Sequence, residues 1–291
     1  MVYLRRKSRS VITKLFHNRE FRAGAILLGF VIITALVGPF LPIGAPNEQD
    51  LSRVILPPVW MSGGSSCLED LLGTDPLGRS TLSRLVFGAR ISLMVGLTSV
   101  LIAGLIGVPA GLLAGYYGGA IDAVLMRIAD IQLAFPPVLL ALAIVATFGG
   151  SLANVTIAIA VTSWVPYARV IRGSVLSLKE RDYIVACQAL GASNFRILLL
   201  HVLPNILTPV LVVATLQVGR AIVTESALSY LGLGVPAPAP SWGAMLSDAR
   251  NYIYTAWWLP TFPGLAIMMT VLGINLVGNG LQAVLDPKLR V

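Results

Sequence analysis

The chain has 291 residues, of which 56% are hydrophobic and 12% are charged. Soluble domains typically carry about 25% charged residues, so this composition excludes an ordinary soluble domain and indicates a membrane protein. The net charge of +8 does not require a nucleic-acid partner, because the cytoplasmic loops of membrane proteins collect Lys and Arg. Two cysteines and two histidines, without CxxC or HExxH spacing, give no candidate metal site.

Six apolar runs are candidates for membrane-spanning helices, each of which needs about 20 residues. In chain order they are residues 23–43, 91–116, 131–147, 152–166, 202–223 and 259–277. The first run follows a basic segment, residues 1–22. That run is too long for the apolar part of a signal peptide and ends without an Ala-x-Ala site, so we interpret it as an uncleaved first transmembrane anchor.

The distribution of charge predicts the sidedness of these spans. With segments 1–22, 117–130, 167–201 and 278–291 on one side, that side holds 15 of the 21 basic and 6 of the 13 acidic residues. The other side holds 6 basic and 7 acidic residues. Since basic loops stay in the cytoplasm, we expect an all-α polytopic membrane protein with six transmembrane helices and both termini cytoplasmic.

Two long segments then face the other side of the membrane. Residues 44–90 are expected to form a Gly- and Pro-rich loop and a short amphipathic helix over 80–90. Residues 225–258 contain three prolines and six aromatic residues, which suits either an aromatic belt at the headgroups or a folded rim that meets an external partner. The predicted permease core covers residues 91–285, and residues 286–291 form a C-terminal tail.

The cytoplasmic segment 169–201 is too long for a tight turn and too apolar for a solvated linker. A helix is expected over 174–190, Gly191 interrupts it, and Ser193 caps a second helix that runs to Pro204. Two short helices joined at a glycine would project from the membrane as a docking element, although helix ends lying at the membrane interface would give the same pattern. Its small apolar tip consists of Ala186, Ala189, Leu190 and Ala192.

The stretch from Tyr183 to Ser193, followed by residues 201–205, resembles the EAA loop of binding-protein-dependent ABC importers. In that family the loop forms a coupling helix seated in a cleft of the ATPase subunit. This sequence departs from the family pattern at Val185 and Cys187, where Glu and the second Ala are usual, so no salt bridge of that glutamate carries over. The resemblance implies an ATPase-coupling role for Tyr183, Ala186, Cys187, Ala189, Leu190, Gly191, Ala192, Ser193 and Pro204.

Four further stretches, 73–80, 130–136, 225–246 and 280–290, resemble motifs of the dipeptide/oligopeptide/nickel permease group, specifically its C-type subunit, and occur in the same order. The resemblance implies the type I ABC importer permease fold, in the inner or plasma membrane of a prokaryote. Transport of peptides or related small solutes by alternating access is then expected. The candidates for a rim that faces the binding protein are Asp75, Arg79, Trp242 and Asp248.

None of the four lysines follows a glycine, so the chain lacks a Gly-Lys-Ser/Thr phosphate loop. We therefore expect no cofactor on this chain and no catalysis by it, with ATP and Mg bound by partner subunits. The resemblance implies a homologous second permease, two ABC ATPase subunits and an extracytoplasmic substrate-binding protein, in addition to membrane lipid and without nucleic acid.

Polar residues within spans are costly against lipid and should face a cavity or another helix. The set consists of Asn154, Gln217, Arg220, Glu225 and Asn275. Hydrogen bonding between helices is the commoner reason for such residues, and lining of a translocation path is the other. Pro136 and Pro137 should kink the third span, as a gate or for packing.

A stand-alone secondary transporter or channel is the alternative function. It would account for six spans but not for a cytoplasmic docking element. An intramembrane enzyme is not supported, because the sequence contains neither a Gly-x-Ser-x-Gly nor a His-Glu-x-x-His motif.

Overall fold

The computed structural model describes residues 13–62 and 70–285, and within them the chain is helical apart from loops and one isolated bridge between Thr74 and Ser80. The helices are α2 (Arg19–Val37), α3 (Val59–Ser62), α4 (Thr81–Tyr117), α5 (Gly119–Leu133), α6 (Pro137–Phe148), α7 (Leu152–Lys179), α8 (Asp182–Ala189), α9 (Asn194–Ile197), α10 (Leu203–Tyr230), α11 (Trp242–Ala249) and α12 (Trp258–Leu285). Short turns of helix are η1 (Gly38–Phe40), η2 (Leu51–Arg53), the π-helical η4 (Leu198–Val202) and η5 (Arg250–Tyr252). The first part of the predicted basic segment and the predicted tail lie outside the described residues.

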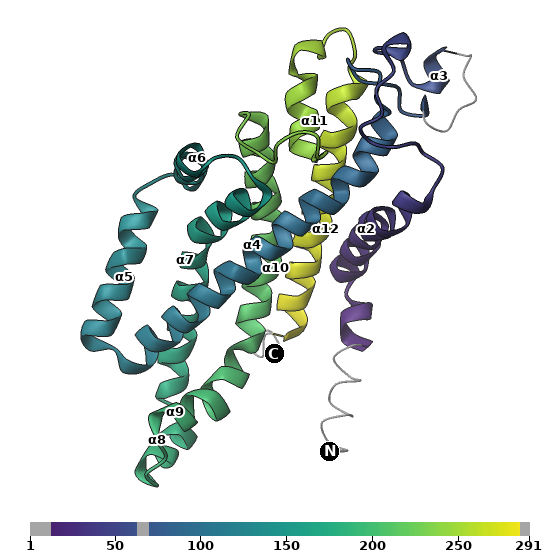
Figure 1. The fold of residues 1–291 in the computed structure, drawn as a ribbon. Coiled ribbons are helices and arrows are strands. Elements are labelled where there is room, and N and C mark those ends of the chain that lie inside the picture. Colours follow the sequence, from purple (N-terminus) through teal and green to yellow (C-terminus); the bar gives the residue numbers. More distant parts are fainter. Residues whose placement is uncertain (1–12, 63–69, 286–291) are drawn as a thin grey trace.

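The long helices form one bundle, with α4 crossing it and α2 and α5 on opposite flanks (Figure 1). By length and composition, five helices of the described chain suffice to cross a membrane: α2 with η1, α4, α7, α9 through α10, and α12. The pair α5 and α6 makes a sixth span if its two parts are counted as one. The all-α class is confirmed. The predicted number of six spans agrees with the structure when α5 and α6 are counted together as one span.

The third span differs from its prediction. A span over 131–147 with a kink at Pro136 and Pro137 was expected. The kink is confirmed as a bend of 86° between α5 and α6, but the span begins earlier, because α5 starts at Gly119. Pro136 and Pro137 cause the break, because the residue before a proline is disfavoured in helical conformation and Pro137 suits the first turn of a new helix. The first part of this span is α5, most of whose residues lie in the segment 117–130 that was predicted as a cytoplasmic loop.

Three other boundaries also differ. The predicted amphipathic helix 80–90 and the second span are one helix, α4, whose N-terminus is capped by the Ser80 side chain accepting from the Ser83 N–H. At 37 residues it is about 55 Å long, well beyond the bilayer core. Helix α7 continues past its predicted end at Pro166, and Pro204 lies in the first turn of α10, where a proline costs no hydrogen bond.

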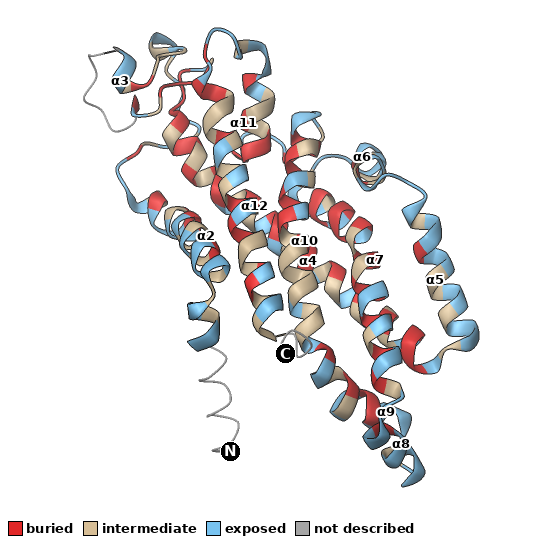
Figure 2. Ribbon diagram, turned by 180° about the vertical axis from the view of Figure 1, so that it is seen from behind, coloured by how far each residue is buried: buried red, intermediate tan, exposed pale blue. Residues whose placement is uncertain are grey.

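Buried residues concentrate along the facing sides of α4, α7, α10 and α12, whereas α5 and α6 are largely exposed (Figure 2). Helices α4 and α7 approach closely because small residues repeat every four positions on α4. Gly107, Gly111 and Gly115 all face the backbone of α7. Without a hydrophobic driving force between helices in lipid, such close contact is a main source of packing energy.

Gly111→Ala should separate α4 from α7. A Cβ at this position would lie 2.5 Å from the Ala168 carbonyl oxygen, a backbone atom that cannot move alone, so we expect a loss of about 1–3 kcal/mol in stability. Gly104→Ala, about two helical turns earlier on α4, is the control, because its Cβ would lie at an ordinary contact distance of 3.6 Å from the Tyr167 ring. Thermal unfolding of the two purified variants measures the difference, and equal midpoints would contradict the packing described.

Candidate functional site

Residues 182–202, termed the coupling hairpin after the role predicted for them, project beyond the long helices at one end of the bundle (Figure 1). The coupling hairpin contains α8, α9 and η4. Gly191 adopts φ +80° between the two helices, a left-handed conformation that glycine reaches without strain. The Ser193 hydroxyl accepts from the Arg196 N–H at 3.4 Å and caps α9. The predicted glycine turn and serine cap are confirmed, whereas the helix predicted over 174–190 is interrupted at Glu180 and Arg181.

This hairpin is anchored by a core of its own. Ile184 and Ile197 are fully buried beside Ile171 and Val175 of α7. The Tyr116 hydroxyl donates to Asn194 Oδ1 at 3.0 Å, and Lys179 Nζ donates to the Tyr116 carbonyl oxygen at 3.1 Å. These contacts join the hairpin to the ends of both α4 and α7, so the hairpin is a packed element rather than a loose loop.

The tip of the hairpin is apolar and exposed. Leu190 is 88% exposed and Phe195 71% exposed. Of the residues predicted for coupling, those on the surface are Tyr183, Ala186, Ala189, Leu190, Gly191, Ser193 and Pro204. Cys187 and Ala192 are half-buried and pack against the hairpin core, where Cys187 Sγ lies 3.8 Å from His201 Nε2.

A second candidate site is a cavity of about 730 Å³ formed by residues of α5, α6, α7, α10 and α12. Its wall includes three of the polar residues predicted from the sequence, Gln217, Arg220 and Asn275, as well as Pro137. Gln217 Nε2 donates to the Ser163 carbonyl oxygen of α7 at 3.2 Å. The polar wall residues that sequence reasoning missed are Thr162, Ser163, Thr224 and Asn279.

For one of these missed residues, Asn279, the sequence did contain a signal. Asn279 follows Asn275 by four positions on α12, which places both side chains on one face of the helix. Threonine and serine gave no comparable signal, because their hydroxyls commonly bond to the carbonyl one turn earlier in the same helix. Thr224 does so, donating to the Arg220 carbonyl oxygen at 2.9 Å.

The remaining candidates lie outside the cavity. Asn154 Nδ2 donates to the carbonyl oxygens of Phe148 and Gly149 at 2.9 and 3.0 Å, so this side chain caps the C-terminal end of α6. Pro136 is exposed at the bend before α6.

Glu225 is fully buried in α10. Its carboxyl group accepts from the Ser229 hydroxyl at 2.8 Å and from the Ser92 hydroxyl of α4 at 3.4 Å. The Ser92 hydroxyl also accepts from the Trp242 N–H at 3.4 Å. Glu225 thereby joins α4, α10 and the start of α11, which is the helix-packing role.

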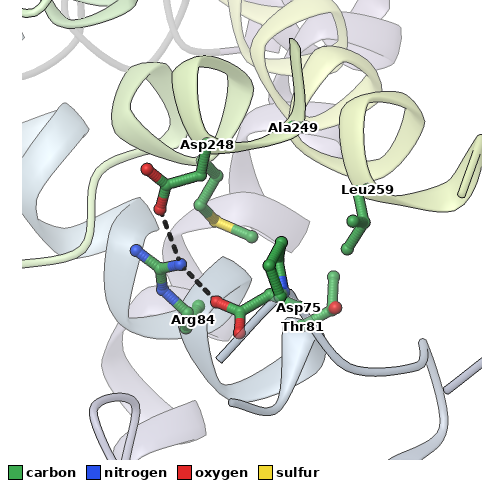
Figure 3. Close-up of a pocket in the computed structure, with 8 residues that line it drawn as sticks. Asp75, Thr81, Arg84, Asp248, Ala249 and Leu259 are labelled. Carbon is green, nitrogen blue, oxygen red and sulfur yellow. Dashed lines mark hydrogen bonds and ion pairs between the residues drawn. The ribbon is translucent and has the colours of Figure 1, made fainter. Parts of the chain in front are cut away.

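At the end of the bundle opposite the hairpin, four charged side chains form the rim cluster: Asp75, Arg79, Arg84 and Asp248. Arg84 lies between the two carboxylates (Figure 3), with Nη1 at 2.7 Å from Asp75 and 3.0 Å from Asp248. Arg79 Nε lies 2.6 Å from Asp75. The cluster ties the start of α4 to α11.

Three of the four residues predicted to face a binding protein are internal. Asp75, Arg79 and Trp242 are buried, and Trp242 Nε1 donates to the Leu85 carbonyl oxygen at 2.9 Å. Asp248, with its side chain 44% exposed, is the one of the four that reaches solvent. The expectation that all four contact an external protein is corrected accordingly: the buried three support the rim from inside.

Comparison with known proteins identifies the family. A family model described as "Binding-protein-dependent transport system inner membrane component" matches residues 107–291. The chain is 45% identical to the Di/tripeptide transport system permease protein DppC of Pseudomonas aeruginosa (strain UCBPP-PA14), covering 94% of this chain and 90% of that one. It is 42% identical to the Glutathione transport system permease protein GsiD of Pectobacterium atrosepticum, covering 92% and 86%.

Among solved structures, the fold is similar to a chain of the MetNI methionine ABC transporter in an inward-facing conformation. The TM-score is 0.57 at 18% identity, covering 70% of this chain and 97% of that one. At this identity the likeness supports the fold, which is that of a type I ABC importer permease. The chain belongs to the family of binding-protein-dependent transport system inner membrane components and is the multi-pass permease subunit of a bacterial ABC importer, without being its ATP-hydrolysing subunit.

Proposed function

We propose that this chain forms one half of the translocation pathway for di- or oligopeptides or a related small solute. Relatives over nearly the whole chain are named for di- and tripeptides, dipeptides and glutathione, all of them short peptides. The cavity suits this role because spanning helices surround it with neutral polar groups. Leu133, Pro137 and Arg220 of its wall are exposed, so a homologous second permease would close it.

The observation that carries the proposal is the apolar tip of the coupling hairpin. An ABC importer works with ATPase and substrate-binding partners, and a tip led by Leu190 on a packed base suits insertion into a groove of an ATPase subunit. Two such subunits, one for each permease, would bind ATP and Mg, and this chain would bind no cofactor itself. The packed base lets movement of the ATPases bias the spans between two states, which a loose tether would not do.

The sidedness follows from the same assignment. The start of α2 and the end of α12 lie toward the end of the bundle that carries the hairpin (Figure 1). With the hairpin on the ATPase side, both ends of the chain would be cytoplasmic. The rim around α11 would then face the extracytoplasmic binding protein, with Asp248 as its accessible acidic group.

Reconstitution tests the proposal. The chain, its homologous permease and two ATPase subunits in proteoliposomes, supplied with the binding protein, should take up radiolabelled dialanine only with ATP and Mg. Omitting the ATPases should abolish uptake. Uptake by the permease chains alone would favour a stand-alone secondary transporter, and ATP-driven uptake without the binding protein would exclude that partner.

A further inference from the structure

Arg220 is the one ionisable side chain in the wall of the cavity within the described part of the chain; the other wall residues are apolar or neutral and polar. A charge inside a spanning helix costs several kcal/mol unless it finds a partner or water. No carboxylate of the described residues lies within ion-pair distance of Arg220. The cavity therefore carries a net positive charge that a transported group of opposite charge would neutralise.

The guanidinium is held in place by a neutral partner. Arg220 Nη1 donates to Gln217 Oε1 at 3.2 Å, and Gln217 is itself fixed by its bond to the Ser163 carbonyl oxygen of α7. One of the five N–H donors of the guanidinium is used in this way. Because glutamine fixes the side chain without neutralising it, the remaining donors stay available to a ligand.

The opposite wall adds neutral donors. Asn275 and Asn279 come from α12, one helical turn apart, and Asn275 Oδ1 lies 3.5 Å from the position that a Cβ on Gly219 would take. Because Gly219 has no side chain, the Asn275 amide lies close to the backbone of α10. An anion beside Arg220 would thus contact the guanidinium of α10 on one side and the two carboxamides of α12 on the other. The paired N–H donors of a guanidinium match the two oxygens of a planar carboxylate.

We propose that Arg220 binds the carboxylate of the solute during its passage, and that for a peptide this is the free C-terminal carboxylate. The inference rests on the proposed transport of peptides. It adds a specificity-determining residue: solutes with a free carboxylate pass, and otherwise identical solutes without one pass more slowly. A single forked contact from one cation is strong enough to select the group and weak enough to release it.

Arg220→Gln in the reconstituted importer is the first test. Uptake of dialanine per ATP hydrolysed should fall about tenfold or more, because a hydrogen bond to a charged group is lost. Arg220→Lys keeps the charge without the forked donors and should recover part of the uptake. ATP hydrolysis stimulated by the loaded binding protein should be unchanged in both variants. Arg22→Gln removes an exposed charge at the start of α2 and should have no effect.

Unchanged uptake in Arg220→Gln would overturn the inference. So would a proportional loss of uptake, ATP hydrolysis and complex assembly, since this would mean that Arg220 pairs with an acidic residue of the second permease. A wild-type importer that transports neither dialanine nor a tripeptide nor glutathione would instead refute the proposed function.

A second measurement does not depend on any variant. Saturation-transfer NMR on the wild-type complex in nanodiscs, without binding protein or nucleotide, compares dialanine with its C-terminal amide. We expect transfer to dialanine and weak transfer to the amide. Equal transfer to both, or none to either, would contradict carboxylate recognition in the cavity.

Discussion

Leu190→Asp should abolish ATP-driven uptake while leaving the permease folded. Leu190 is 88% exposed at the tip of the coupling hairpin, where no internal contact depends on it. In the assembled importer the same side chain would enter an apolar groove of the ATPase subunit, and a carboxylate there would be desolvated without a partner. Central interface residues of this kind contribute about 2–4 kcal/mol to binding, so the ATPase should dissociate or lose its stimulation.

Two readouts separate the outcomes. Co-purification of the ATPase subunits measures docking, and dialanine uptake measures transport. Leu51→Asp is the matched control, because Leu51 is 75% exposed in η2, far along the chain from the hairpin. Retained ATPase binding and full uptake in Leu190→Asp would show that the tip does not transmit force.

The coupling hairpin could be predicted from the sequence because its signals are local. A glycine at the turn and a serine at the following cap act through bonds within a few residues, and neither depends on the rest of the fold. The coupling role itself is a prediction from the resemblance to the EAA loop. The break at Glu180 was missed because the composition on both sides of it is equally compatible with a helix.

The third span was misplaced for a different reason. Hydropathy alone disfavours α5 as part of a span, since it carries Asp122, Arg127 and Asp130. In the structure, both acidic residues pair with α7: Arg172 holds Asp122 through two hydrogen bonds of 2.5 and 2.6 Å, and Arg169 lies 2.6 Å from Asp130. Partners about 40 to 50 positions away cancel the charges, which no local window detects.

The same limit applies to the rim. Asp75 and Arg79 lie in a recognised motif, and Asp248 was a candidate just after another, but their grouping with Arg84 joins residues 164 positions apart in sequence. Nothing near Arg84 in the sequence indicates that it is buried. Cavity residues such as Thr162 were missed likewise, because the packing of α7 against α10 decides which hydroxyls of α7 face the cavity.

Within the rim cluster, Asp75→Asn should destabilise the chain far more than Asp248→Asn. The two carboxylates contact the same guanidinium groups, but the Asp75 side chain is 6% exposed and that of Asp248 is 44% exposed. Asp75 also accepts from the N–H groups of Leu77 and Arg79 at 2.9 and 3.0 Å. Removing one partner of a buried ion pair leaves an uncompensated charge and costs about 3–5 kcal/mol, whereas an exposed pair contributes about 0–1 kcal/mol.

Because Arg84 keeps its contact with Asp248 in the Asp75→Asn variant, we expect a loss near the lower end of that range. Denaturant titration in mixed micelles measures it, with the fluorescence of buried Trp242, which packs in the first turn of α11, as the local probe. Adding Arg84→Met to Asp75→Asn should recover part of the loss, since an apolar side chain in place of a buried unpaired cation removes the desolvation cost. Equal, small losses in the two single variants would mean that water reaches Asp75 and that the cluster does not hold α11 against α4.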